Sequence, residues 1–156
     1  MITKRELIKY LQNDLPGESA QWKMAPVGRP KQGSNANLSY RKAAVLIAFR
    51  TTQSEPHLIM TLRSEYDGIH SAQVSFPGGK FDAYETDPVQ VALREMEEET
   101  GVSRSKIEVL GMLSPLHIPV SGMLVQPVVG WIDSDITFNP DPREVQRLMQ
   151  VGYTQL

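Results

Sequence analysis

The 156-residue chain contains no cysteine, which excludes disulfide bonds and thiolate metal sites. Its formal net charge of -2 is too small to attract nucleic acid or an anionic membrane, so we expect neither as a partner. The longest apolar run, residues 43–49, is far shorter than the roughly 20 residues that cross a bilayer. The first 16 residues also lack the apolar core of a signal peptide. These absences predict a soluble, cytoplasmic protein that recognises its partner at a local site.

The length predicts one folded domain, which we place at residues 40–156. Before it, apolar residues at helical spacing between Ile2 and Leu11 predict a short helix with Thr3 as its N-cap. Residues 16–39 are rich in proline, glycine, serine and asparagine and predict an irregular lead-in. We therefore expect residues 1–39 to form an N-terminal helix followed by irregular chain.

Apolar continuity and turn signals predict most of the strands. We expect strands joined by a hairpin at 42–49 and 57–63, an extended piece ending in a Gly78-Gly79 turn, strands at 106–119 and 122–132 (the second interrupted at Pro127), and a turn followed by a short helix at 139–151. Because helical crossovers do not separate consecutive strands, this order predicts a mixed α/β sandwich and not a doubly wound fold.

An acidic helix is predicted at residues 88–100. Asp87 is a good N-cap, and Pro88 stands at the first helical position, where its missing N–H costs nothing. Gly101 is placed to end the helix in the left-handed conformation. At 100° per residue, one side of this helix is an apolar stripe formed by Ala92, Leu93 and Met96. The adjoining side is an acidic face formed by Glu95, Glu98 and Glu99.

Like charges at this spacing cost about 0.2–0.5 kcal/mol per pair, and the dipole at a helix C-terminus adds to the penalty. Glu97 points away from the other three. A bound divalent cation would reverse both penalties, and carboxylate oxygens suit Mg²⁺. The alternative is an acidic helix face that is simply solvated.

The segment "GKFDAYETDPVQVALREMEEETGV", residues 79–102, resembles the Nudix box, G-x5-E-x7-R-E-U-x-E-E-x-G-U, in which U is aliphatic. The matching positions are Gly79, Glu85, Arg94, Glu95, Met96, Glu98, Glu99, Gly101 and Val102. The spacing departs once, because eight residues and not seven separate Glu85 from Arg94.

That longer spacing is typical of the coenzyme A pyrophosphatase branch of Nudix hydrolases. The branch also carries an upstream signature similar to L-L-T-x-R-S, a spacer and F-P-G-G. Residues 58–80 resemble it through Thr61, Arg63, Ser64, Gly68 and Phe76-Pro77-Gly78-Gly79.

The resemblance implies a Nudix α/β/α sandwich with a mixed sheet, in which helix 88–100 is the catalytic helix. It implies metal ligands at Glu95, Glu98 and Glu99, holding Mg²⁺ or Mn²⁺. Arg94 is expected to pair with Glu85 and to orient the glutamates. Gly78 and Gly79 are expected to open the loop that leads to the helix.

The implied reaction is hydrolysis of a nucleoside diphosphate-linked small molecule, with coenzyme A giving 3′,5′-ADP and 4′-phosphopantetheine. Glu98 and the downstream Glu144 are both candidates for the general base, and a solvated acid is the alternative for Glu144. Arg63 is the best candidate for a substrate phosphate and Lys80 a weaker one. Alternatively, Arg63 pairs with Glu65 or Asp67.

Two other functions stay open: a Nudix pyrophosphohydrolase for a nucleoside diphosphate sugar or a nucleoside triphosphate, or a non-catalytic Nudix-like module that binds nucleotides. Family members normally continue beyond the position of Leu156 with a strand and a helix that cover the second sheet face. We therefore expect a truncated C-terminal layer, with self-association as a homodimer or reduced stability.

Overall fold

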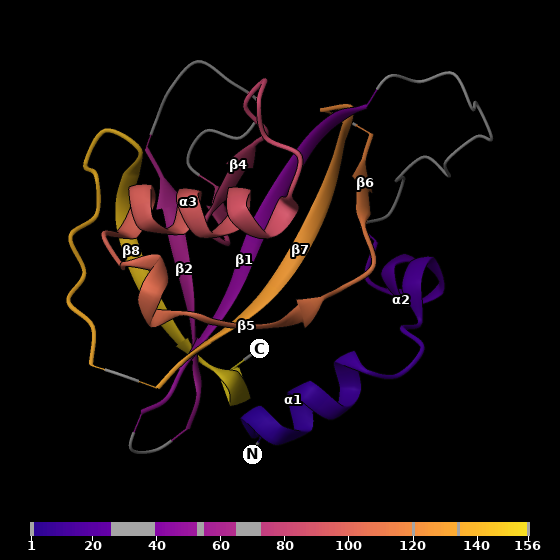
Figure 1. Cartoon of the computed structure of the whole chain (residues 1–156), viewed down its shortest axis with the longest axis horizontal. Helices are drawn as coiled ribbons and strands as arrows, with labels where there is room; N and C mark the ends of the chain where they lie inside the picture. The colour runs from indigo at the N-terminus through magenta and orange to yellow at the C-terminus, as the bar shows by residue number, and fades with distance from the viewer. Residues whose placement is uncertain are drawn as a thin grey trace.

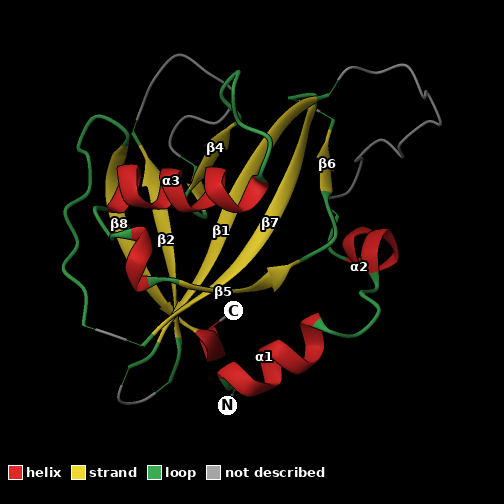
Figure 2. Cartoon of the chain, in the orientation of Figure 1, coloured by secondary structure: helices red, strands yellow, loops and turns green. Residues whose placement is uncertain are grey.

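The computed structural model describes residues 2–25, 40–52, 55–64, 73–119, 121–133 and 135–155. A mixed sheet forms the middle layer, with helix α3 (Pro88–Thr100) across one face and helix α1 (Lys4–Leu11) against the other (Figure 1). The predicted mixed α/β sandwich is confirmed. Figure 2 shows that the strands form the centre and that the helices lie outside them.

The central position of strand β1 (Arg41–Arg50) in the sheet explains why its sequence is a nearly continuous apolar run. Ala44, Leu46 and Ala48 pack into the core beneath α3, whereas Ile47 and Phe49 join the cluster beneath α1. A strand that is covered on both faces needs apolar side chains at successive positions.

Strand β1 pairs in parallel with β7 (Met123–Ile132) along ten residues, and antiparallel with β2 (His57–Arg63) near their shared hairpin. Beyond the hairpin, β3 (Val74–Ser75) pairs with β2 and β4 (Gly78–Lys80) pairs with β1. The segment from β3 to β4 therefore lies between the diverging strands. The predicted Gly-Gly turn is wrong, because both glycines lie in β4 and pair with β1.

On its other edge, β7 pairs with two short strands, β5 (Glu108–Met112) and β6 (Leu116–Ile118). The prediction of a single strand at 106–119 is therefore wrong. Its first residue ends the 3₁₀ helix η1 (Arg104–Lys106), and a short loop separates β5 from β6. Pro127 lies opposite that loop, where its carbonyl accepts from the Leu113 N–H at 3.0 Å. Its missing N–H leaves no ladder bond unmade there, so β7 continues through the proline.

Two further expectations about secondary structure are wrong. The helix predicted within 139–151 is instead strand β8 (Val145–Gly152), which pairs with β2 along its length. The lead-in contains helix α2 (Gly17–Lys23), while its residues 26–39 lie outside the described part of the chain. A second 3₁₀ helix, η2 (Tyr153–Gln155), follows β8.

Helix α1 confirms the predicted N-cap. The Thr3 hydroxyl accepts from the Glu6 N–H at 3.3 Å, and the Glu6 carboxylate accepts from the Thr3 N–H at 2.8 Å, which completes a capping box. Leu7 and Leu11 pack against the cluster of Phe49 and Trp131. In the described residues, no helix is long and apolar enough to cross a membrane.

Candidate functional site

Helix α3 begins and ends at the predicted residues. The Asp87 carboxylate accepts from the Val89 N–H at 2.9 Å, and Gly101 ends the helix with a φ of 74°. The predicted apolar stripe is confirmed, since all three of its members are buried in the core, together with Val91. The helix is therefore fixed at both ends and along one side, which fixes the directions of its glutamates.

The Arg94 guanidinium joins three carboxylates of the predicted site. Its Nε and Nη2 donate to the two carboxylate oxygens of Glu85 at 2.8 and 3.0 Å, which is a bidentate contact. Its Nη1 donates to Glu95 at 2.9 Å and to Glu98 at 2.8 Å. Nη2 also donates to the Lys80 carbonyl at 3.3 Å. Arg94 thus connects the segment before the helix, strand β4 and two glutamates of the acidic face.

Glu85 is held by more than Arg94, because its carboxylate also accepts from the Asp82 N–H at 2.8 Å. The hydrogen bonds from Arg94 hold the pKa of Glu85 below its ordinary value, with the Asp82 N–H contributing. Its neighbours raise the pKa of the Arg94 guanidinium above its ordinary value, Glu85 most of all. This pair is therefore ionised throughout the physiological range.

Gly79 allows strand β4 to approach α3 closely. A Cβ at this position would overlap the Glu95 carboxylate, so any larger residue would displace that side chain or the helix. Gly78 is equally constrained from the other side, where a Cβ would overlap the backbone of Ala44 and Val45 in β1. The two glycines therefore serve close packing between β1, β4 and α3.

Glu99 lies on the side of α3 that faces the sheet, where it is 1% exposed. Its Oε1 accepts from Arg63 Nη1 at 3.2 Å and its Oε2 from the Thr61 hydroxyl at 3.4 Å. Burial raises the pKa of Glu99 to about 7; Arg63 opposes the rise, and the charges of Glu95 and Glu144 add to it. Glu99 is thus held by β2 and not by Arg94.

Burial also raises the pKa of Glu95, while Arg94 opposes the rise and Glu98 and Glu144 add to it. Glu144 stands in the turn before β8, where its carbonyl accepts from the Ser64 N–H at 2.9 Å. Although Glu144 is far from α3 in the sequence, the charge of its carboxylate raises the pKa of both Glu95 and Glu99.

These carboxylates fit a hard divalent cation in their chemistry. Burial raises the pKa of both Glu95 and Glu99, and the charges of neighbouring carboxylates raise each further, a cost that a bound cation would offset. In the arrangement seen here, Arg94 holds Glu95 and Glu98 while β2 holds Glu99. Among the described residues, no three acidic or histidine side chains are gathered closely enough to surround one ion.

The residues expected to bind substrate are distributed differently. Arg63 contacts Glu99, while its proposed alternative partners, Glu65 and Asp67, lie outside the described residues, as does Gly68. The Lys80 side chain is exposed. The structure therefore brings Arg63 to a predicted metal ligand.

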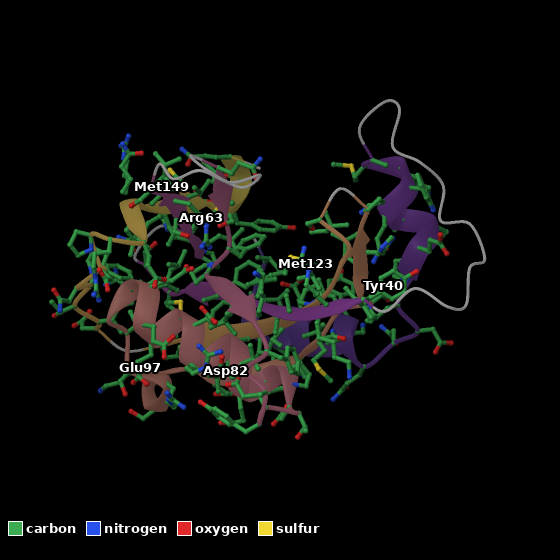
Figure 3. All side chains as sticks on the ribbon, turned by 90° about the horizontal axis from the view of Figure 1, so that it is seen from above. Tyr40, Arg63, Asp82, Glu97, Met123 and Met149 are labelled. Atoms are coloured by element: carbon green, nitrogen blue, oxygen red, sulfur yellow. The ribbon has the colours of Figure 1, made fainter. Side chains whose placement is uncertain are left out.

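Glu97 points to the outer side of α3, away from Arg63 (Figure 3). Its Oε2 accepts from Arg104 Nε at 2.8 Å and its Oε1 from the Arg104 N–H at 3.2 Å. The predicted separation of Glu97 from the other glutamates agrees with this contact. Glu97 binds the turn that follows the helix.

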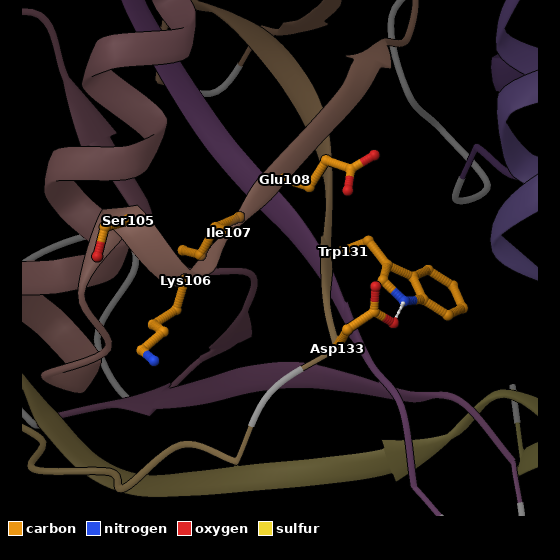
Figure 4. Close-up of a pocket in the computed structure, with 6 residues that line it drawn as sticks. All are labelled: Ser105, Lys106, Ile107, Glu108, Trp131 and Asp133. Atoms are coloured by element: carbon orange, nitrogen blue, oxygen red, sulfur yellow. Dashed lines mark hydrogen bonds between the residues drawn. The ribbon is translucent and has the colours of Figure 1, made fainter.

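A hollow of about 330 Å³ lies elsewhere, beside β5 and the end of β7 (Figure 4). It is lined by Ser105, Lys106, Ile107, Glu108, Trp131 and Asp133. None of the predicted site residues lines it. No sequence pattern predicted this hollow, and the carboxylate chemistry of α3 is a better guide to function.

Sequence reasoning assigned no role to Thr61, although it is fully buried and contacts Glu99. A usable signal was present: Thr61 and Arg63 are two residues apart in a predicted strand, so their side chains share one face.

Comparisons with known proteins agree with this fold. A family model described as NUDIX domain matches residues 39–148, more than half of the chain. The "Uncharacterized Nudix hydrolase NudL" of Yersinia enterocolitica is 41% identical over 79% of this chain. The protein of the same name in Escherichia fergusonii is 38% identical over 80% of it. The chain spans only 62% and 64% of the lengths of these two relatives.

Solved structures show the same fold at low identity. The binary complex of a C. elegans Ap4A hydrolase aligns with a TM-score of 0.62 at 19% identity, covering 72% of this chain and 81% of that one. The NUDIX domain of Shewanella oneidensis NrtR complexed with ADP ribose aligns with a TM-score of 0.56 at 14% identity, covering 86% and 83%.

Proposed function

This chain belongs to the Nudix family, and we propose that it acts as a metal-dependent hydrolase of a nucleoside diphosphate-linked small molecule. One observation carries the proposal: Arg94 joins Glu85 to Glu95 and Glu98 through contacts of 2.8 to 3.0 Å. A surface that merely carried charge would not need a guanidinium, 17% exposed, to fix two adjacent carboxylates.

Each residue of the candidate site has a distinct part in the proposed reaction. Glu95, Glu98 and Glu99 would hold Mg²⁺ or Mn²⁺, whose bound form neutralises diphosphate charge and lowers the pKa of the attacking water. Arg94 orients Glu95 and Glu98, and Glu85 fixes Arg94. Gly79 leaves the space that the Glu95 carboxylate occupies.

The base that accepts a proton from the attacking water is proposed to be Glu98 or Glu144. Among the three proposed metal ligands, Glu98 has the most exposed side chain, at 56%, and can reach a water molecule. Glu144 is exposed and close enough to Glu95 and Glu99 to raise the pKa of each. The variant Glu144→Gln distinguishes them: a changed pH dependence of kcat would identify Glu144 as the base, and an unchanged one would leave Glu98.

Coenzyme A or a derivative is the proposed substrate. Support comes from the resemblance of residues 58–80 to the upstream signature of the coenzyme A branch, and from the eight-residue spacing between Glu85 and Arg94. Another diphosphate, such as an ADP-sugar, is the second candidate; one structural neighbour is complexed with ADP ribose.

The test is product analysis after incubation with coenzyme A, ADP-ribose, NADH and deoxynucleoside triphosphates, with Mg²⁺ or Mn²⁺. Glu98→Gln is the inactivating variant and Glu97→Gln the matched control, since both remove one charge from neighbouring positions of the same helix. We expect 3′,5′-ADP from coenzyme A with the wild type and with Glu97→Gln, and none with Glu98→Gln.

Turnover of another diphosphate would reject coenzyme A and keep the reaction. Equal activity of Glu98→Gln and the wild type would reject the role of the acidic face. If folded protein cleaves no substrate but binds a nucleotide, the chain is a binding module.

A further inference from the structure

Two separate parts of the sequence meet at the Glu99 carboxylate. Glu99 comes from α3, and the two side chains that donate to it, Thr61 and Arg63, come from β2. Because alternate residues of a strand share a face, the T-x-R spacing aims both side chains at the helix. Each oxygen of the carboxylate has one of these donors.

Burial makes those donors necessary. A carboxylate that is 1% exposed has lost its water and is costly unless protein groups replace that water. Within the described part of the chain, the hydrogen bonds to the Glu99 side chain come from Thr61 and Arg63. The direction of the Glu99 carboxylate therefore depends on β2.

We propose that Thr61 and Arg63 are positioning residues that fix Glu99 for the divalent cation. This inference rests on the proposed function. It gives Arg63 a different role from the substrate phosphate ligand expected from the sequence. Thr61 is fully buried and cannot touch a substrate, so it acts through Glu99.

The acidic face is thereby oriented from two sides. Arg94 holds Glu95 and Glu98 from within α3, while β2 holds Glu99 across the interface between helix and sheet. Side chains that hold a metal ligand typically change metal affinity by about 10- to 100-fold when they are removed. The contacts of 3.2 and 3.4 Å are long for hydrogen bonds to a carboxylate, so we expect effects near the lower end.

Mn²⁺ binding, measured by electron paramagnetic resonance without substrate, tests the role of Thr61. Thr61→Val removes the hydroxyl and keeps the shape, so we expect about tenfold weaker Mn²⁺ binding. Thr61→Ser keeps the hydroxyl and should bind Mn²⁺ within about twofold of the wild type. In a Glu99→Gln background, Thr61→Val should cause no further loss, because its effect passes through Glu99.

Arg63→Gln separates positioning from substrate binding. A positioning residue changes the Mn²⁺ affinity in the absence of substrate, whereas a phosphate ligand raises KM and leaves Mn²⁺ affinity unchanged. Circular dichroism and thermal unfolding in EDTA establish that each variant is folded. If Thr61→Val does not fold, Arg63→Gln decides the question.

The proposal is overturned if folded Thr61→Val and Arg63→Gln bind Mn²⁺ like the wild type. It is also overturned if the effects of Thr61→Val and Glu99→Gln multiply. In either case, Mn²⁺ binding by the wild type would remain consistent with the proposed function. A wild-type protein that binds no Mn²⁺ would reject the metal chemistry and this role together.

Discussion

Two groups of charged side chains on opposite faces of the sheet differ in their surroundings. On the α3 side, Arg94 is 17% exposed, and two of its three carboxylate partners, Glu85 and Glu95, are 10% and 14% exposed. On the α1 side, Lys4 donates to Glu108 and Asp133 at 2.7 and 2.9 Å, but these two acids are 56% and 64% exposed. The contact lengths are alike and the burial is not.

Burial decides what such contacts contribute. Exposed pairs compete with water and salt and contribute little, whereas removing one partner of a buried pair leaves the other charged and without solvent. We therefore propose a catalytic role for the α3 group and a docking role for the α1 group, where Lys4 connects the first helix to the sheet.

Arg94→Ala should have the largest effect. It leaves Glu85 and Glu95 without their shared cation, so we expect a loss of unfolding free energy on the order of 3 kcal/mol. Activity should fall by about 100-fold, because Glu95 and Glu98 lose their orientation. Chemical denaturation and steady-state kinetics measure the two effects, with Arg104→Ala as the control, since Arg104 holds Glu97. Equal effects of the two variants would contradict the distinction between the acidic face and Glu97.

Gly79→Ala should be next, because its Cβ would overlap the Glu95 carboxylate. We expect a loss of about 1–3 kcal/mol, as for other residues forced into a packed site, together with weaker Mn²⁺ binding. Gly122→Ala is the matched control: a Cβ there meets nothing within 4 Å, although the φ of 60° makes alanine strained. Gly122→Ala should therefore lower stability without changing Mn²⁺ affinity. Unchanged Mn²⁺ binding in Gly79→Ala would show that Glu95 can move without consequence.

Helix α3 could be predicted to the residue because its signals are local. Asp87, Pro88 and Gly101 mark its ends regardless of the rest of the fold. Strand β8 could not be predicted in this way, because Val145, Leu148 and Met149 stand at helical spacing. The segment is a strand because β2 supplies the partners for its backbone hydrogen bonds. A partner far away in the sequence decides such a segment, and propensity does not.

The candidate site divides in the same way. The contact between Arg94 and Glu85 was predictable from the resemblance, and the structure places the two together. The contact of Thr61 and Arg63 with Glu99 depends on how α3 crosses β2, which no local pattern states. The long-range effect of Glu144 on Glu95 and Glu99 likewise appears only once β8 is paired beside β2.

Lys4→Ala tests the exposed side of the comparison. It removes the contacts of α1 with Glu108 and Asp133, and because those acids remain solvated we expect a smaller decrease in melting temperature than for Gly79→Ala. Raising the salt concentration should reduce the difference between Lys4→Ala and the wild type, since exposed pairs are screened. Catalytic activity should not change. A decrease as large as that of Arg94→Ala would show that exposure does not separate the two groups.

The pH dependence of the same group gives the smallest effect. The Asp133 carboxylate accepts from Lys4, from Trp131 Nε1 at 2.6 Å and from the Thr51 hydroxyl at 3.2 Å, with Glu108 also near Lys4. These hydrogen bonds hold the pKa of Asp133 below its ordinary value of 3.8, the contact with Lys4 first among them. The unfolded chain then binds the proton more tightly, so the stabilisation is present above the ordinary pKa and is lost as pH falls through the lowered one.

Melting temperatures of the wild type and Asp133→Asn, measured from about pH 7 to about pH 3, isolate this group from the other carboxylates. The wild type should be the more stable near neutral pH, and the difference should narrow toward the acid end as Asp133 takes up its proton. A difference that stays constant or widens on acidification would mean that the negative charge of Asp133 does not stabilise the fold. The α1 group would then owe its stability to packing against Trp131, and the contrast with the α3 charges would be sharper still.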